Sequence, residues 1–137
     1  MFTVSVKAIY GLCAMGELGL KHNAGPVQIR EIAEAHDIPQ HYLEQLLVIL
    51  KKAGLVESFR GAQGGYALAR NPSQIQVPEI LSALDGKLQV IPEQKKKNSL
   101  SFFWYDLQAA IFEHMDISLE DLILRQQNAK GEFIYNI

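Results

Sequence analysis

Apolar residues recur every three to four positions along most of the chain, which is the spacing that predicts helices with one buried face. The predicted helices cover residues 3–21, a short segment from about residue 29, 39–53, 78–84, 99–115 and 118 to about 131. We expect Gly54 to end the third helix in a left-handed conformation, and the last helix to fray near Gly131. Pro39 is predicted at the first position of the third helix, and Asp121 at the capping-box position of the last.

After the third helix the pattern changes to that of short strands. Residues 55–59 and 66–69 are the predicted strands, and the glycine-rich residues 60–65 between them predict a hairpin. Two short helices, a tight turn and a hairpin make a winged helix-turn-helix, so the predicted fold class is mainly α with a small β wing. The expected organisation is a winged helix-turn-helix DNA-binding domain over residues 1–85, a linker over 86–98, and a long apolar helix with a C-terminal helix over 99–137, packed as one unit with the first helix.

The third helix carries polar side chains opposite its leucines. On a helical wheel these side chains form one group, Gln40, His41, Glu44 and Gln45. In a major groove, Gln suits adenine and Glu suits cytosine, and the first two turns of a recognition helix are the part that reaches the bases. At the hairpin tip, Arg60 beside Gly61 is suited to a narrow minor groove.

Each of these features also has a simpler interpretation. A polar helix face is commonly just solvated, and a glycine-rich tip is more often only a turn. The tip joins two strands rather than opening a helix, which disfavours a nucleotide-binding loop. The order of the elements favours DNA binding, whereas no pairing of nucleophile and base, or of carboxylates, stands in a motif that indicates an enzyme.

The charge of the chain limits how DNA would be held. The formal net charge is −2, and residues 1–85 contain seven basic and eight acidic side chains, which sum to −1. Positive groups must therefore gather on one face, and non-specific binding should be modest. We expect Lys7, Lys51 and Arg60 to flank the recognition helix, with Glu31 and Glu34 turned away from DNA.

The single cysteine restricts the available cofactor chemistry. Cys13 alone cannot form an intramolecular disulfide, a cysteine-rich zinc site or a cysteine-ligated iron–sulfur cluster within one chain. It falls on the apolar pattern of the first helix, so a buried, inert thiol is expected. The four histidines are not at metal-ligand spacing, and solvated or DNA-facing positions are expected for His36 and His41. Because neither a signal peptide nor a membrane-spanning run is evident, a cytoplasmic protein is predicted.

Three segments together resemble the Rrf family of bacterial winged-helix regulators: Tyr42-Leu43-Glu44-Gln45-Leu46, Ala53-Gly54-Leu55-Val56 and the stretch from Arg60-Gly61 to Tyr66-Ala67-Leu68. The resemblance implies a dimer on a roughly palindromic DNA operator, with His41, Glu44 and Gln45 at base-reading positions, Arg60 in the wing and Lys7 near a phosphate. It also implies that the long helix forms much of the dimer interface and crosses the partner's first helix. The interface residues predicted in this way are Leu100, Phe103, Trp104, Leu107 and Ile111.

The chain departs from the cluster-binding members of that family. Those members carry three cysteines before the dimerisation helix, and residues 87–101 here contain none. Asn98 and Ser101 stand nearest the third cysteine and the histidine ligand, and Ile9 matches the acidic ligand of a variant site. A cluster is therefore excluded. The prediction is a dimeric, cofactor-free repressor whose signal is a small-molecule effector or a partner protein. The alternative is a winged-helix interaction module, or a regulator controlled by a partner enzyme, that does not bind DNA directly.

Overall fold

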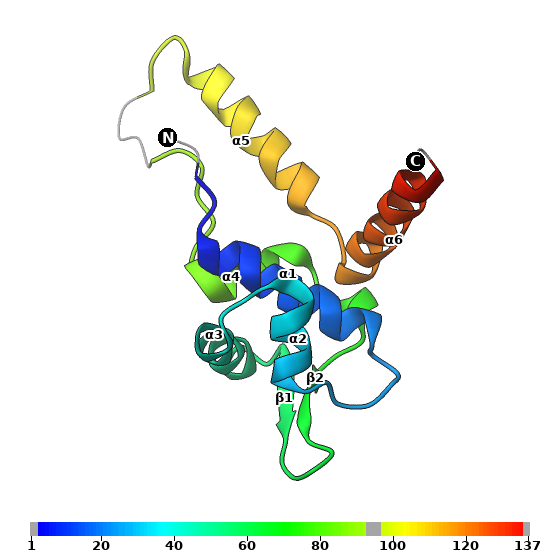
Figure 1. Cartoon of the computed structure of the whole chain (residues 1–137). Helices are drawn as coiled ribbons and strands as arrows, with labels where there is room; N and C mark the ends of the chain where they lie inside the picture. Colours follow the sequence, from blue (N-terminus) through cyan, green and yellow to red (C-terminus); the bar gives the residue numbers. More distant parts are fainter. Residues whose placement is uncertain (1–2, 93–96, 136–137) are drawn as a thin grey trace.

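A computed structural model, drawn in Figure 1, confirms the predicted fold class of helices with a small two-stranded wing. It describes the backbone of residues 3–92 and 97–135, and side chains up to residue 130; residues 93–96 of the predicted linker lie outside the described part. The elements are α1 (Val6–Leu20), α2 (Ile29–His36), α3 (Gln40–Lys52), β1 (Val56–Phe59), β2 (Gly65–Leu68), the 3-10 turn η1 (Pro72–Gln74), α4 (Val77–Asp85), α5 (Ser101–Met115) and α6 (Leu119–Tyr135).

Capping explains where the helix boundaries differ from those predicted. The hydroxyl of Ser5 accepts the Ala8 N–H at 3.0 Å, so α1 begins only after Ser5. Pro39 is not the first helical residue as predicted: its ψ of 125° is extended, and it caps α3 from outside. The predicted fraying near Gly131 is wrong, because α6 continues to Tyr135. A single glycine costs a helix only about 1 kcal/mol and does not end it without further breakers.

The core is built on the leucine stripe of α3. Leu43, Leu46, Leu47 and Leu50 are each at most 1% exposed, and they belong to one cluster with residues of α1, α2, α4 and both strands. Full burial of one such side chain stabilises the fold by about 1.5–3 kcal/mol. Helix α3 is therefore fixed by the same contacts that hold the domain together.

Small residues on α1 let two other helices approach it closely. A Cβ added at Gly11 would overlap the Leu84 side chain of α4, and one added at Gly19 would overlap Ile123 of α6. At Gly16 the space is open, since the nearest atom would lie 4.0 Å away. Thus α1 contacts α4 at one end and α6 at the other, with close packing at two specific glycines.

The wing is joined to the segment before the helix-turn-helix by an isolated β-bridge that the sequence pattern did not predict. β1 and β2 are antiparallel with Phe59 opposite Gly65, and Tyr66 of β2 exchanges two backbone hydrogen bonds of 2.8 Å with Val27, just before α2. Gly65 has φ +146°, and a Cβ there would clash with the Val27 carbonyl. The close approach of these two backbones therefore depends on glycine at position 65.

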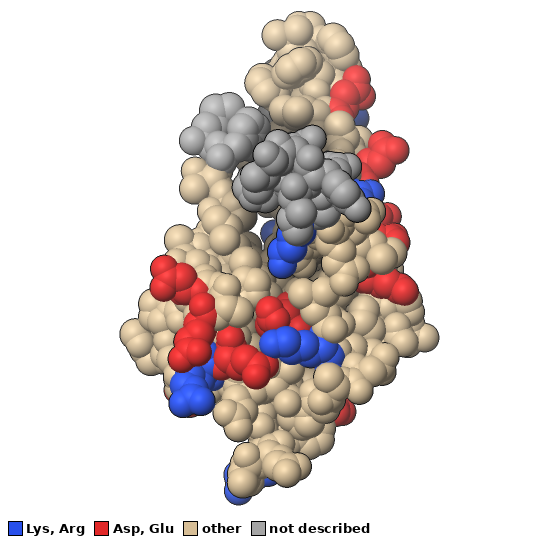
Figure 2. All heavy atoms as spheres, turned by 45° about the vertical axis from the view of Figure 1, so that its right-hand side comes forward, with Lys and Arg blue, Asp and Glu red and all other residues tan. Residues whose placement is uncertain are grey.

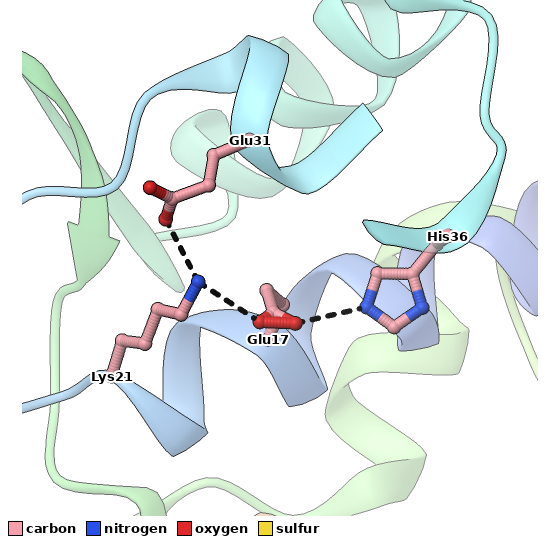
Figure 3. Close-up of polar contacts among 4 residues, drawn as sticks. All are labelled: Glu17, Lys21, Glu31 and His36. Atoms are coloured by element: carbon pink, nitrogen blue, oxygen red, sulfur yellow. Dashed lines mark hydrogen bonds and ion pairs between the residues drawn. The ribbon is translucent and has the colours of Figure 1, made fainter. Parts of the chain in front are cut away.

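A polar cluster ties α1 to α2, as Figure 3 shows. The carboxylate of Glu17, whose residue is only 8% exposed, lies 3.4 Å from Nζ of Lys21 and 3.3 Å from Nε2 of His36. Lys21 in turn donates to Glu31 at 2.8 Å. His36 is thus not solvated as predicted but half-buried, because the buried Glu17 carboxylate needs a partner.

Two pKa shifts accompany the surface ion pairs. The hydrogen bond to Glu31 raises the pKa of Lys21 above its ordinary 10.5, against opposing desolvation, so this stabilisation is complete below pH 10.5 and is lost as pH rises through the raised value. Arg70 binds Glu79 at 2.7 Å, links the end of β2 to α4, and holds the pKa of Glu79 below 4.5. That contribution is present above pH 4.5 and is lost as pH falls through the lowered value.

Helix α5 stands apart from the winged domain, as Figure 1 shows. Within it only Ser101 is buried, while Phe102, Phe103 and Tyr105 are 64%, 52% and 38% exposed. The segment after α4 is attached to it through Gln108, whose side-chain oxygen accepts the N–H groups of residues 90 and 91 at 3.3 Å. No helix in the described part of the chain is both long and apolar enough to cross a membrane.

We expect Gly65→Ala to lower the free energy of unfolding by about 1–3 kcal/mol, because the new side chain meets backbone and the φ value is unfavourable for alanine. Gly16→Ala is the matched control, and we expect it to be neutral or to stabilise α1 by up to about 1 kcal/mol. Urea unfolding followed by circular dichroism measures both. Equal midpoints for Gly65→Ala and the wild type would contradict the close approach at Val27.

We expect Glu17→Ala to lower the free energy of unfolding by about 1–3 kcal/mol, because it leaves half-buried His36 without its acceptor and removes one partner of Lys21. Glu34→Ala changes an exposed glutamate on α2 and should stay within about 0.5 kcal/mol of the wild type. The same unfolding measurement compares them. Identical effects of the two substitutions would show that the cluster around Glu17 adds nothing.

Candidate nucleic-acid interface

Helices α2 and α3 form a helix-turn-helix through a three-residue turn. Asp37 adopts the left-handed conformation with φ 52°, which aspartate tolerates better than most residues. Ile38 follows and is 4% exposed, so it anchors the turn in the core, and its N–H donates to the Ala33 carbonyl at 3.0 Å. Pro39 then leads into α3. The turn is fixed by burial on one side and backbone hydrogen bonding on the other.

The exposed face of α3 holds all four residues predicted to read bases. Gln40, His41, Glu44 and Gln45 are exposed, on the side opposite the leucine stripe. The half-buried Tyr42 meets Tyr10 of α1 edge-on, with ring centroids 5.9 Å apart. The helix thus presents donors and acceptors outward from a rigid base, which is the arrangement that direct readout requires.

The wing extends from the lower end of the domain in Figure 1, and its tip is made by glycines. Arg60 and Gly61 are exposed there, and Gly61 has φ +100°. A Cβ added at Gly64 would clash with the Phe59 carbonyl, so the tip turns back more tightly than a larger residue would allow. Arg60 is therefore displayed on a narrow, defined turn.

The two predicted flanking lysines differ in their surroundings. Nζ of Lys51 donates to the Ser58 hydroxyl at 2.6 Å, which links the end of α3 to strand β1 of the wing. Lys7 is exposed at the start of α1, one turn before Tyr10. In Figure 1, α3 lies between this end of α1 and the wing. Lys7 thus belongs to a helix, and Arg60 to a hairpin, that both contact α3.

Charged side chains of both signs are mixed over the surface drawn in Figure 2, which agrees with the small net charge of −2. On the face drawn in Figure 2, acidic and basic side chains are interspersed, and basic atoms lie at the lower end, on the wing. Glu31, which we expected to lie away from DNA, forms an ion pair with Lys21 in the α1–α2 cluster. On α3 itself the acidic residue is Glu44, and two lysines follow at its C-terminal end.

The residues present do not fit an iron–sulfur cluster. Cys13 is half-buried, and burial raises the pKa of its thiol, which disfavours the thiolate that binds metal. Asn98 and Ser101 form the turn that starts α5, where the Ser101 hydroxyl accepts the Asn98 N–H at 2.9 Å. Within the described residues, no three His, Cys, Asp or Glu side chains come together as a metal site.

One further residue of this surface was missed from the sequence. Val48 lies on the exposed face of α3 and is 46% exposed. A pattern of leucines facing the core and polar residues facing outward does not predict an exposed valine. The signal that could have identified it is its wheel position, one turn after Glu44 and Gln45.

Comparison with known proteins shows to which family the chain is similar. Residues 4–125 match the Rrf2 family, described as an iron-dependent transcriptional regulator. The chain is 40% identical to the HTH-type transcriptional regulator CymR of Bacillus subtilis, over 98% of this chain and 99% of CymR. It is 36% identical to the HTH-type transcriptional regulator IscR of Escherichia coli O1:K1, over 88% of this chain and 80% of that protein.

Two solved structures have the same fold. The structure of B. subtilis CymR, described as the global cysteine regulator of that organism, superposes with a TM-score of 0.85 at 36% identity, covering 91% of this chain and 98% of CymR. IscR of T. potens superposes with a TM-score of 0.80 at 40% identity, covering 93% and 90%. With the helix-turn-helix and wing described above, these likenesses establish that the chain belongs to the Rrf2 family and is a DNA-binding transcriptional regulator, not an enzyme.

Proposed function

We propose that the chain acts in the cytoplasm as a homodimeric repressor that reads a palindromic operator, with α3 in the major groove and the wing in the minor groove. The observation that carries this proposal is the exposed polar face of α3, held in place by four buried leucines and flanked by the wing. A helix in this setting fits the width of the major groove.

The proposed roles of the contact residues follow from their hydrogen-bonding groups. Gln40 and Gln45 pair with adenine, Glu44 accepts from cytosine, and His41 contacts a base edge or phosphate. Arg60 enters the minor groove, where a narrow groove concentrates negative potential, and Gly61 lets the backbone approach. Lys7 and Lys51 contact phosphates and set the register of the protein on the duplex.

The proposed dimer rests on the apolar surface of α5 and the start of α1. Apolar and aromatic side chains occur all round α5, yet most of it is exposed, and a helix with this pattern is normally covered. Of the five predicted interface residues, Leu100 and Phe103 are 60% and 52% exposed, and Trp104, Leu107 and Ile111 are half-buried. Val4, Val6 and Ile9 are also at least 50% exposed. A second copy would cover both surfaces.

The signal must act without a cysteine-ligated cluster. A small-molecule effector or a partner protein is the proposed input, and analysis of what co-purifies from the native host would identify it. Because the similar CymR is described as a global cysteine regulator, genes of cysteine metabolism are the first candidate targets.

We expect Arg60→Ala and Gln45→Ala each to weaken operator binding by about 1–3 kcal/mol, because each removes a placed contact. The operator is first selected from genomic DNA with the purified protein, and affinities are then measured by mobility shift at fixed salt. Glu34→Ala, exposed on α2, is the control with unchanged affinity. Enrichment of no motif would favour the interaction-module alternative, and unchanged affinity of both variants would refute these contact assignments.

We expect Phe103→Glu to convert the dimer to a monomer, because it places a charge in the proposed interface without disturbing the core. Ala109→Glu places the same charge at an exposed position about 120° away around α5 and should leave the dimer intact. Sedimentation velocity distinguishes the two states. Dissociation by both substitutions, or by neither, would show that the assigned face of α5 is wrong.

A further inference from the structure

Val48 stands out on the exposed face of α3. It lies three residues after Gln45 and four after Glu44, so these three side chains project from the same side of the helix. Val48 is 46% exposed, whereas the leucines on the opposite side are almost fully buried. An apolar group therefore lies in the third turn of α3, directly after the polar side chains proposed to face the bases.

Core packing within the folded chain does not account for valine at this position. The side chain is not a member of the buried core or of the half-buried shell around it. Valine is also a poorer helix former than lysine, glutamate or glutamine, because its branched side chain loses rotamer freedom against the preceding turn. The neighbouring residues on this face are polar, so Val48 is the one place on it where an apolar group of a partner could be matched.

The major groove supplies a matching group. Of the features that the four base pairs present there, the 5-methyl group of thymine is the apolar one, and the others are hydrogen-bond donors and acceptors. The valine side chain neither donates nor accepts hydrogen bonds. A base edge other than the thymine methyl group, packed against it, would therefore lose its hydrogen bonds to water without replacement. We propose that Val48 reads a thymine by packing against its 5-methyl group. This proposal rests on the proposed operator binding.

The position of that thymine follows from helix geometry. Residues on a helix are separated by about 1.5 Å along its axis, so Val48 is about 4.5 Å beyond Gln45. Successive base pairs are about 3.4 Å apart. The thymine therefore lies one or two base-pair steps from the base pair that Gln45 contacts, within each half-site.

The test replaces each thymine of the selected operator, one at a time in both half-sites, by deoxyuridine, which lacks the methyl group and keeps the pairing. The wild-type chain should lose about fourfold in affinity per half-site at one thymine, the effect expected for one buried methyl group. Val48→Ala should bind the unmodified operator more weakly and show no loss at that same thymine. Urea unfolding of Val48→Ala should match the wild type, because the side chain is exposed.

Gln45→Ala provides the matched control. It should weaken binding overall and keep the loss at the Val48-dependent thymine. A scan without any effect in the wild type, an effect that persists in Val48→Ala, or an operator without thymine at that distance overturns the role of Val48 and leaves operator binding intact. Selection of no operator at all overturns the proposed operator binding, and the role of Val48 with it.

Discussion

The burial of one face of α3 is the constraint on which the rest of the molecule depends. Four leucines insert into a core shared with α1, α2, α4 and the strands, so the helix cannot rotate about its axis without exposing them. The same constraint determines which side chains face outward. Packing of the leucines in the core thus positions the polar residues on the opposite face of α3.

The wing is held to the helix-turn-helix by two connections of different strength. The backbone pair between Val27 and Tyr66 joins it to the start of α2, and Lys51 adds a side-chain hydrogen bond from the end of α3. An exposed hydrogen bond adds little by itself, whereas the backbone pair depends on Gly65 and allows little change. Helix-turn-helix and wing are therefore joined directly, whereas α5 stands apart from both.

The helices and the hairpin could be predicted because their signals are local: leucines at helical spacing, Gly54 with φ +77°, and glycines at the wing tip. The pairing of Val27 with Tyr66 could not be predicted, because it joins segments far apart in the chain and Val27 has no partner pattern nearby. The half-buried His36 was missed for the same reason, since its partner Glu17 belongs to another helix. The outward residues of α3 were predictable from the helical wheel, except that Val48 did not fit a division into apolar-inside and polar-outside.

The exposure of α5 has a consequence for the proposed dimer, because its stability then depends on the concentration of the chain. In the proposed dimer, association covers the interface face of α5, so mass action couples the free energy of the folded state to the concentration of the chain. At low abundance more chains would carry an uncovered α5, and at high abundance the covered form would dominate. In the proposed dimer, the cellular concentration of the chain would therefore set, beside any signal, what fraction of the chains is paired and presents two α3 helices together.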